Sequence, residues 1–108
     1  MAYSALVVFV ETPVFTRRVQ ECLDDEEYAR LEGYLVERPD SGKIIKGSGS
    51  IRKLRWAGSG RGKRGGLRVI YYWWVAQDRI SMLTVYPKSE RDDLTADQLK
   101  QLRNQLVP

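Results

Sequence analysis

Five residues between positions 53 and 88 could together bind and cleave a phosphodiester: Lys53, Arg55, Arg68, Tyr86 and Lys88. Arginine forks match a phosphate in shape and charge, and they can stabilise the phosphorane formed when a nucleophile attacks phosphorus. A Lys or Tyr whose pKa is lowered by neighbouring cations can remove a proton, and a second cation can assist the leaving oxygen. Because RNA supplies its own 2′-hydroxyl nucleophile, these residue types indicate RNA cleavage without a metal ion.

The composition excludes several other kinds of chemistry. The chain has no His, which removes Ser-His-Asp and Cys-His catalysis and His-ligated zinc. The single Cys22 cannot form an internal disulfide or a Cys-rich metal cluster, and it fits a reducing compartment. No apolar run approaches the ~18 residues of a membrane span, and no secretory signal is visible. We therefore expect a cytoplasmic protein without metal or cofactor and without a membrane partner.

The charges are distributed unevenly along the chain. Residues 41–77 contain nine Lys or Arg, eight of the nine glycines and no acidic residue, whereas the first 40 residues hold nine acids and four bases. Basic residues beside Gly and aromatic side chains are typical of a nucleic-acid surface. The alternative is a solvated hairpin edge that Lys and Arg protect from aggregation. Further candidate RNA-binding residues in this block are Arg52, Arg61, Lys63 and Arg64.

The glycine-rich loop at 58–66 holds three of these cations. It lacks the order of a phosphate-binding P-loop, because no Gly-Lys is followed by Ser or Thr. It could grip a phosphate backbone or be a plain hairpin loop. Among the aromatic residues, Tyr72, Trp74 and Tyr86 could stack on a base. Trp73 and Trp74 are adjacent and face opposite sides of a strand, so at least one of them is expected in the core.

The elements that must position these residues can be read from apolar spacing and caps. A chain of 108 residues is expected to form one domain, residues 1–108. We predict strands at 5–10, 51–57, 67–75 and 79–86, and a loop or ragged strand at 43–50. Thr12 and Pro13 begin a first helix, and Asp24 or Asp25 caps a second one that ends near residue 37. A capping box at 95–98 begins the third helix.

The order of these elements predicts an α+β fold. Strands joined by hairpins indicate an antiparallel sheet of about four strands, with the helices grouped on one face. The inward side of the second helix is expected to hold Tyr28, Leu31, Leu35 and Val36. Strand alternation places Leu54 and Trp56 against the helices and Lys53 and Arg55 on the open face. Arg68, Tyr86 and Lys88 can reach that face, and the acids before residue 41 are not expected to cover it.

Several segments resemble toxins of the RelE/HigB type. They are Ile51-Arg52-Lys53-Leu54-Arg55-Trp56, Gly62-Lys63-Arg64-Gly65-Gly66-Leu67-Arg68, Tyr86-Pro87-Lys88 and Asp93-Leu94-Thr95, and the match is closest to the HigB-like branch. The resemblance implies an mRNA interferase of a type II toxin–antitoxin pair, which cleaves mRNA in the A site of the small ribosomal subunit. It also implies a cognate antitoxin, here expected to be a helix-turn-helix protein encoded nearby, which neutralises the toxin.

The resemblance implies a role for each candidate. Arg68 occupies the position of the phosphate-binding arginine, Lys53 and Arg55 the basic positions of the preceding strand, and Tyr86 and Lys88 the Tyr-x-Lys stretch. Pro87 replaces a smaller residue, and Ser89 lacks the basic side chain found in other branches, which leaves the proton donor open. Two other functions use the same basic face: a non-catalytic nucleic-acid-binding module, and a domain that binds an acidic protein.

Overall fold

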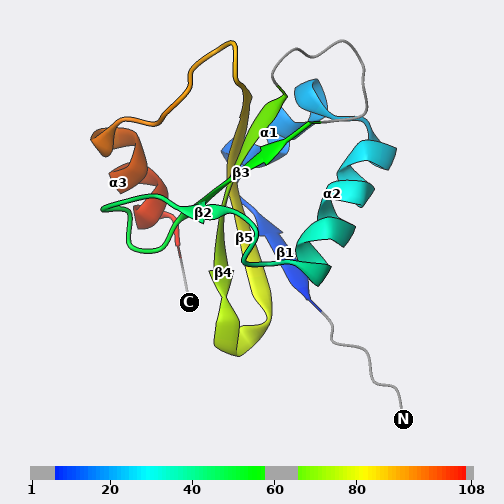
Figure 1. The fold of residues 1–108 in the computed structure, drawn as a ribbon, viewed down its shortest axis with the longest axis horizontal. Helices are drawn as coiled ribbons and strands as arrows, with labels where there is room; N and C mark the ends of the chain where they lie inside the picture. The colour runs from blue at the N-terminus through cyan, green and yellow to red at the C-terminus, as the bar shows by residue number, and fades with distance from the viewer. Residues whose placement is uncertain (1–6, 58–65, 107–108) are drawn as a thin grey trace.

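A five-stranded sheet separates two N-terminal helices from a C-terminal helix (Figure 1). The computed structural model describes residues 7–57 and 66–106. The elements in chain order are β1 (Val8–Glu11), α1 (Pro13–Cys22), α2 (Asp25–Glu37), β2 (Lys43–Ile44), β3 (Arg52–Trp56), β4 (Leu67–Trp74), β5 (Arg79–Pro87) and α3 (Ala96–Asn104). A single 3-10 turn, Val75–Gln77, joins β4 to β5. The predicted α+β class is confirmed.

The sheet differs from the prediction in strand number and direction. Its order is β1-β5-β4-β3-β2, and β1 runs parallel to β5 whereas the other neighbours are antiparallel. The prediction of about four antiparallel strands followed from hairpins, which set the direction of β3, β4 and β5. No hairpin connects β1 to β5, so local sequence does not determine their relative direction. The ragged segment at 43–50 supplies the short fifth strand, β2.

Side-chain caps fix where the helices begin, as the sequence predicts. Thr12 caps α1: its hydroxyl accepts a hydrogen bond from Phe15 N at 3.0 Å and donates one to Leu83 O at 2.7 Å. Asp24 rather than Asp25 caps α2, through a capping box with Glu27. The capping box of α3 is formed by Thr95 and Gln98.

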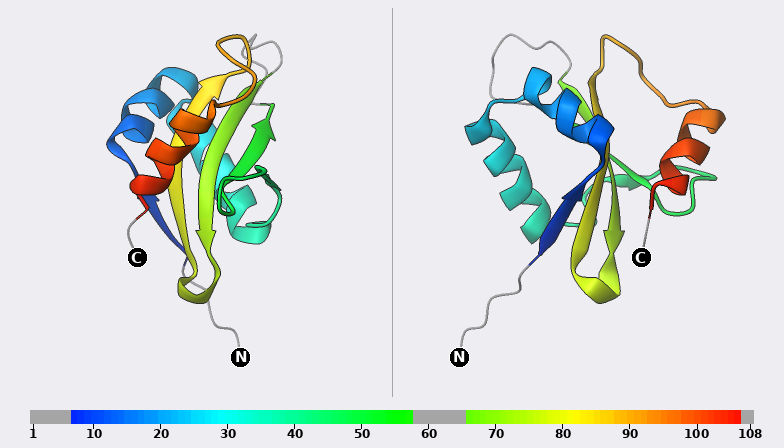
Figure 2. Two further views of the ribbon diagram at one scale, coloured as in Figure 1. Left: turned by 90° about the vertical axis from the view of Figure 1, so that its left-hand side faces the viewer. Right: turned by 180° about the vertical axis from the view of Figure 1, so that it is seen from behind.

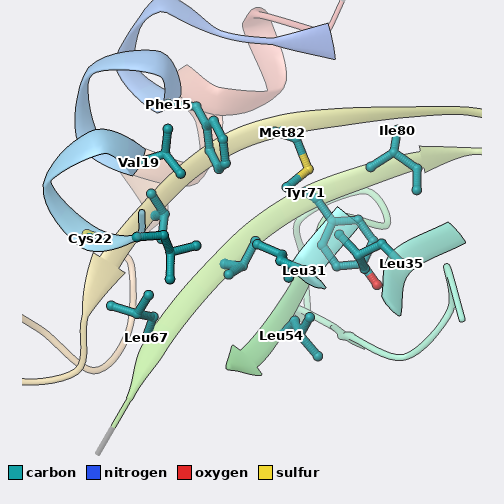
Figure 3. Close-up of a cluster of buried hydrophobic side chains, with 13 residues drawn as sticks. Phe15, Val19, Cys22, Leu31, Leu35, Leu54, Leu67, Tyr71, Ile80 and Met82 are labelled. Carbon is teal, nitrogen blue, oxygen red and sulfur yellow. The ribbon is translucent and has the colours of Figure 1, made fainter. Parts of the chain in front are cut away.

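The larger core lies between the sheet and the first two helices (Figure 3). Phe15 and Val19 of α1 and Leu31 and Leu35 of α2 pack there, together with Leu54, Tyr71 and Met82 from the sheet. Trp56 packs against the same cluster, as predicted, and Trp73 also packs there, which shows which of the two adjacent tryptophans of β4 faces inwards. Val36 is exposed, contrary to the prediction. It lies about 100° around the helix from Leu35, at the edge of the buried stripe.

The C-terminal helix lies on the opposite face of the sheet, which corrects the prediction that all helices share one face (Figure 2). A second, smaller cluster lies beneath α3 and consists of Ile51, Ile70, Leu83, Tyr86 and Leu102. The helix pattern shows that α3 has an apolar stripe, but the stripe does not specify which face of the sheet it covers. Part of the face expected to be open is therefore covered.

A β-bulge in β5 determines which side chains accompany Arg68. Ile70 pairs with Thr84 and Tyr71 with Met82, so Leu83 is an extra residue in β5. Strict alternation from Ile80 would place Tyr86 on the face of α1 and α2. The extra residue changes the phase of the alternation, so Tyr86 lies on the face of α3, directly across from Arg68.

Candidate active site

Three neighbouring strands bring the predicted residues together on the α3 face of the sheet. Arg55 of β3 pairs with Arg68 of β4, and Arg68 pairs with Tyr86 of β5. Lys53 lies on the same face as Arg55, two residues before it, and pairs with Ile70. The predicted convergence of these four residues is present in the structure, although their chemical roles stay predictions.

A pocket of about 540 Å³ lies beside Arg55 and Arg68, the two of these four residues that line it. Its described lining is Arg55, Trp56, Ala57, Gly66, Arg68, Lys88 and Asp92. Lys88 lines it despite the preceding Pro87, because Lys88 N donates a hydrogen bond to Gly66 O at 3.1 Å. Gly66 has φ +71°, and a Cβ there would lie 2.6 Å from Trp56 O, so this close approach requires glycine. The pocket thus combines three cations and one carboxylate.

Arg68 is the most buried cation of the pocket, with 3% of its surface exposed. Its Nη2 lies 3.6 Å from Asp92 Oδ1, and it stands directly across from Arg55, which is exposed. The 3.6 Å separation makes the pairing of this buried cation with Asp92 a long one, and two like charges opposite each other on adjacent strands repel. Binding of an anion between the two guanidinium groups would offset both effects.

Two carboxylates of the segment after β5 already contact this cluster, and the sequence analysis missed them. Asp93 Oδ1 lies 2.6 Å from Lys53 Nζ, and Asp92 faces Arg68. The hydrogen bond and charge of Lys53 hold the pKa of Asp93 below its usual range. The two Asp side chains are largely exposed. They contact the same cations that a bound phosphate would use, so the chain's own acids do reach the basic face.

Tyr86 is placed differently from an exposed catalytic group. Only 2% of its surface is exposed, and it packs in the cluster with Leu102. Its hydroxyl donates to the Asp92 carbonyl at 3.5 Å. Burial raises the pKa of Tyr86 and the charge of Asp93 adds to this effect, although Arg68 opposes it. In this arrangement Tyr86 keeps its proton at neutral pH and is unsuited to act as a base.

The remaining aromatic candidates lie away from Arg68. Tyr72 and Trp74 contact each other edge-on at 4.9 Å, and Arg79 stacks over Trp74 at 4.6 Å. Tyr72 follows Arg68 by four residues on β4, which corresponds to about 13 Å along the strand. The structure therefore does not bring these rings to the pocket.

Arg52 is also outside the cluster. Its guanidinium donates to Asp40 O at 2.9 Å and to Gly42 O at 2.7 Å, so it holds the turn between α2 and β2. Arg61, Lys63 and Arg64 lie outside the described residues. Within 7–57 and 66–106, no group of three or more His, Cys, Asp or Glu residues could hold a metal ion, and no helix is long and apolar enough to cross a membrane.

Comparison with known proteins identifies the fold. No family model matches the chain. Among solved structures, a variant of the Escherichia coli toxin RelE with two arginines replaced by alanine, determined in the free state, is similar with a TM-score of 0.59. The similarity covers 94% of this chain and 98% of the RelE chain, at 12% sequence identity. The RelE-like architecture expected from the sequence is therefore confirmed at the level of the fold.

Proposed function

We propose that this protein is the toxin of a type II toxin–antitoxin pair and inhibits translation by cleaving mRNA in the ribosomal A site. The observation that carries the proposal is the pocket in which Arg55, Arg68 and Lys88 converge from two strands and the segment after β5. The RelE-like fold supports it at the level of architecture. The Gly-Lys-Arg-Gly-Gly sequence at 62–66 favours the HigB-like branch.

In the proposed reaction the 2′-oxygen attacks phosphorus and the 5′-oxygen leaves, giving a 2′,3′-cyclic phosphate and a 5′-hydroxyl. Arg68 and Arg55 bind the non-bridging oxygens and stabilise the dianionic phosphorane. Lys88 can donate a proton to the leaving oxygen, because its ammonium group lines the same pocket. The pocket also contains Asp92, whose carboxylate can accept the 2′-hydroxyl proton once the phosphate has displaced it from Arg68. Lys53 positions the backbone, and protonated Tyr86 supports Asp92 from below.

The proposed partners are mRNA, the ribosome and a cognate antitoxin, which places the protein in the cytoplasm. The antitoxin is expected to mask the cationic pocket with an acidic segment. Arg55 and Lys88 are exposed, whereas Arg68 is buried and faces Asp92, so the new contacts should fall on the first two. Substitution of Arg55 or Lys88 should therefore weaken the complex. If Arg55 and Lys88 stay exposed in the complex and the toxin is nevertheless inactive, the bulk of the antitoxin must instead block access to the ribosome.

A purified translation system separates this function from its alternatives. The proposal predicts mRNA cut inside the reading frame, with 5′-hydroxyl ends, only when ribosomes are present. A non-catalytic nucleic-acid-binding module would retard RNA in a gel without cutting it. A domain that binds an acidic protein would do neither. Intact mRNA at toxin concentrations above those of the ribosome would refute the proposal.

A further inference from the structure

A second hollow of about 700 Å³ adjoins the candidate active site. It lies between the β2–β3 edge and the N-terminal half of α3, and it shares Arg55 with the first pocket. Its described lining is Ser41, Lys43, Ile44, Ile45, Lys46, Lys53, Leu54, Arg55, Asp93, Leu94, Ala96 and Leu99.

The lining combines a cationic rim with an aliphatic floor. Four of the described lining residues are Lys or Arg, and the one carboxylate, Asp93, is paired with Lys53. Ile45 of the β2–β3 wall and Leu94 and Leu99 on the opposite side are partly buried, and they pack against the cluster beneath α3. A rim of unbalanced positive charge around exposed apolar surface fits a ligand with a flat apolar part and a negative part. An RNA nucleotide has both.

The wall formed by residues 43–51 is held in place by its own hydrogen bonds. Lys43 pairs with Lys53, and Ile45 N donates to Ile51 O at 2.8 Å. Ser48 is fully buried; its hydroxyl donates to Ile45 O at 2.6 Å and accepts from Ile51 N at 3.0 Å. A hollow that is formed before its ligand arrives avoids the entropic cost of ordering a loop on binding.

We propose that this hollow binds the mRNA nucleotide adjacent to the cleaved phosphate, with its base on Ile45, Leu94 and Leu99 and its phosphate at Lys43 and Lys46. The inference rests on the proposed function. An RNA strand whose phosphate lies between Arg55 and Arg68 must leave the first pocket, and Arg55 connects the two spaces. Lys53 and Arg55 are two residues apart on one face, about 6.6 Å, which is close to one nucleotide step.

An aliphatic floor would select bases by size and shape. Discrimination by apolar contacts is weaker than discrimination by hydrogen bonds, because a smaller base leaves no buried polar group unpaired. The expected preference at this nucleotide is therefore graded, with cleavage rates that differ by about tenfold among the four bases.

The test compares pocket variants with a control that loses the same charge. Lys43→Gln/Lys46→Gln removes two cations of the rim, and Ile45→Ala changes the floor. The control, Arg17→Gln/Lys100→Gln, removes two exposed cations from outer surfaces of α1 and α3. Cleavage is measured on ribosomes carrying mRNA with a randomised A-site codon. Binding of a 2′-O-methyl RNA hexamer, which cannot be cleaved, is measured in parallel.

The double lysine variant should raise KM about tenfold at unchanged kcat. The slope of its log binding constant for the hexamer against log salt concentration should become shallower by about 0.7 for each lost phosphate contact. Ile45→Ala should change the base distribution beside the cut, and the control should match wild type. Pocket variants that match the control, while wild type cleaves, would overturn this inference alone. The inference also fails if the pocket variants cleave normally but no longer bind the antitoxin, because the occupant is then an acidic peptide.

Wild type that binds the hexamer without cleaving mRNA would overturn the proposed function alone. Loss of hexamer binding in the lysine variant would in that case still support the hollow as an RNA site. Wild type that does neither overturns both.

Discussion

Replacement of Arg68 by methionine tests the centre of the proposed site. Arg68 lies between Arg55 and Tyr86 on adjacent strands, and 3% of its surface is exposed. Alanine would remove the charge and also leave a cavity between Arg55 and Tyr86. Methionine keeps an unbranched side chain of similar length and adapts to irregular space, so Arg68→Met isolates the loss of the guanidinium group.

The two expected effects differ in size. Loss of one donor that stabilises the transition state costs about 3 kcal/mol, or roughly 10² in rate. Stability should change much less. The variant loses the 3.6 Å contact to Asp92, whose carboxylate is 66% exposed, and such exposed contacts contribute about 0–1 kcal/mol. It also loses the repulsion between Arg68 and Arg55, which acts in the opposite direction by about 0.2–1 kcal/mol.

The assay pairs single-turnover mRNA cleavage on ribosomes with thermal unfolding of the same preparations. Arg68→Met should cleave about 100-fold more slowly, with Tm within about 8 °C of wild type. Arg68→Lys should fall between the two, because lysine supplies a point charge without the planar fork. If Arg68→Met unfolds like wild type and also cleaves at the wild-type rate, Arg68 does not contact the reacting phosphate.

Three further outcomes follow from the same geometry. Asp93→Asn should free Lys53, so the uncleavable hexamer binds more tightly and with a steeper salt dependence. Weaker binding would show that Asp93 does not compete with RNA phosphates for Lys53. Lys53 lowers the pKa of Asp93 in the folded chain. The ion pair is therefore fully present above the unfolded pKa of Asp and is lost only as the pH falls through the lower folded value. The gain in RNA binding caused by Asp93→Asn should accordingly be constant between about pH 5 and 8. Thr12→Ala loses a helix cap and a hydrogen bond to Leu83 O, and denaturant unfolding should show a loss of about 1–2 kcal/mol with unchanged cleavage per folded molecule. Lys63→Ala should reduce cleavage only mildly and flatten its salt dependence, as expected for a residue that positions the RNA backbone; an unaltered salt slope would argue against phosphate contact by the loop.

Local patterns predicted much of the frame that carries the site. Alternation along β3 placed Leu54 in the core and Lys53 on the opposite face, and both assignments are confirmed. The caps at Thr12 and Thr95 are confirmed because an N-cap depends only on residues within one turn. These features are determined by neighbours in sequence.

The missed features depend on residues far apart in the chain. The bulge at Leu83 is set by the packing of two faces of β5, and it moves Tyr86 to the face of Arg68. Asp93 lies 40 residues after Lys53, and nothing in the intervening sequence indicates that the two will meet. The position of α3 depends on the course of the segment after β5. Where that segment returns over the sheet is decided by the whole fold.

These missed residues change how the site controls its charge. The sequence alone indicates an uncovered cationic surface, whereas the structure shows Asp92 and Asp93 beside Arg68 and Lys53. Both carboxylates are exposed, so a phosphate can displace them without opening the core. Free phosphodiesters must compete with these internal anions. An mRNA that the ribosome already holds in place pays less of the entropic cost of binding and can win that competition. Under the proposed function, the two carboxylates would therefore favour ribosome-bound mRNA over free RNA.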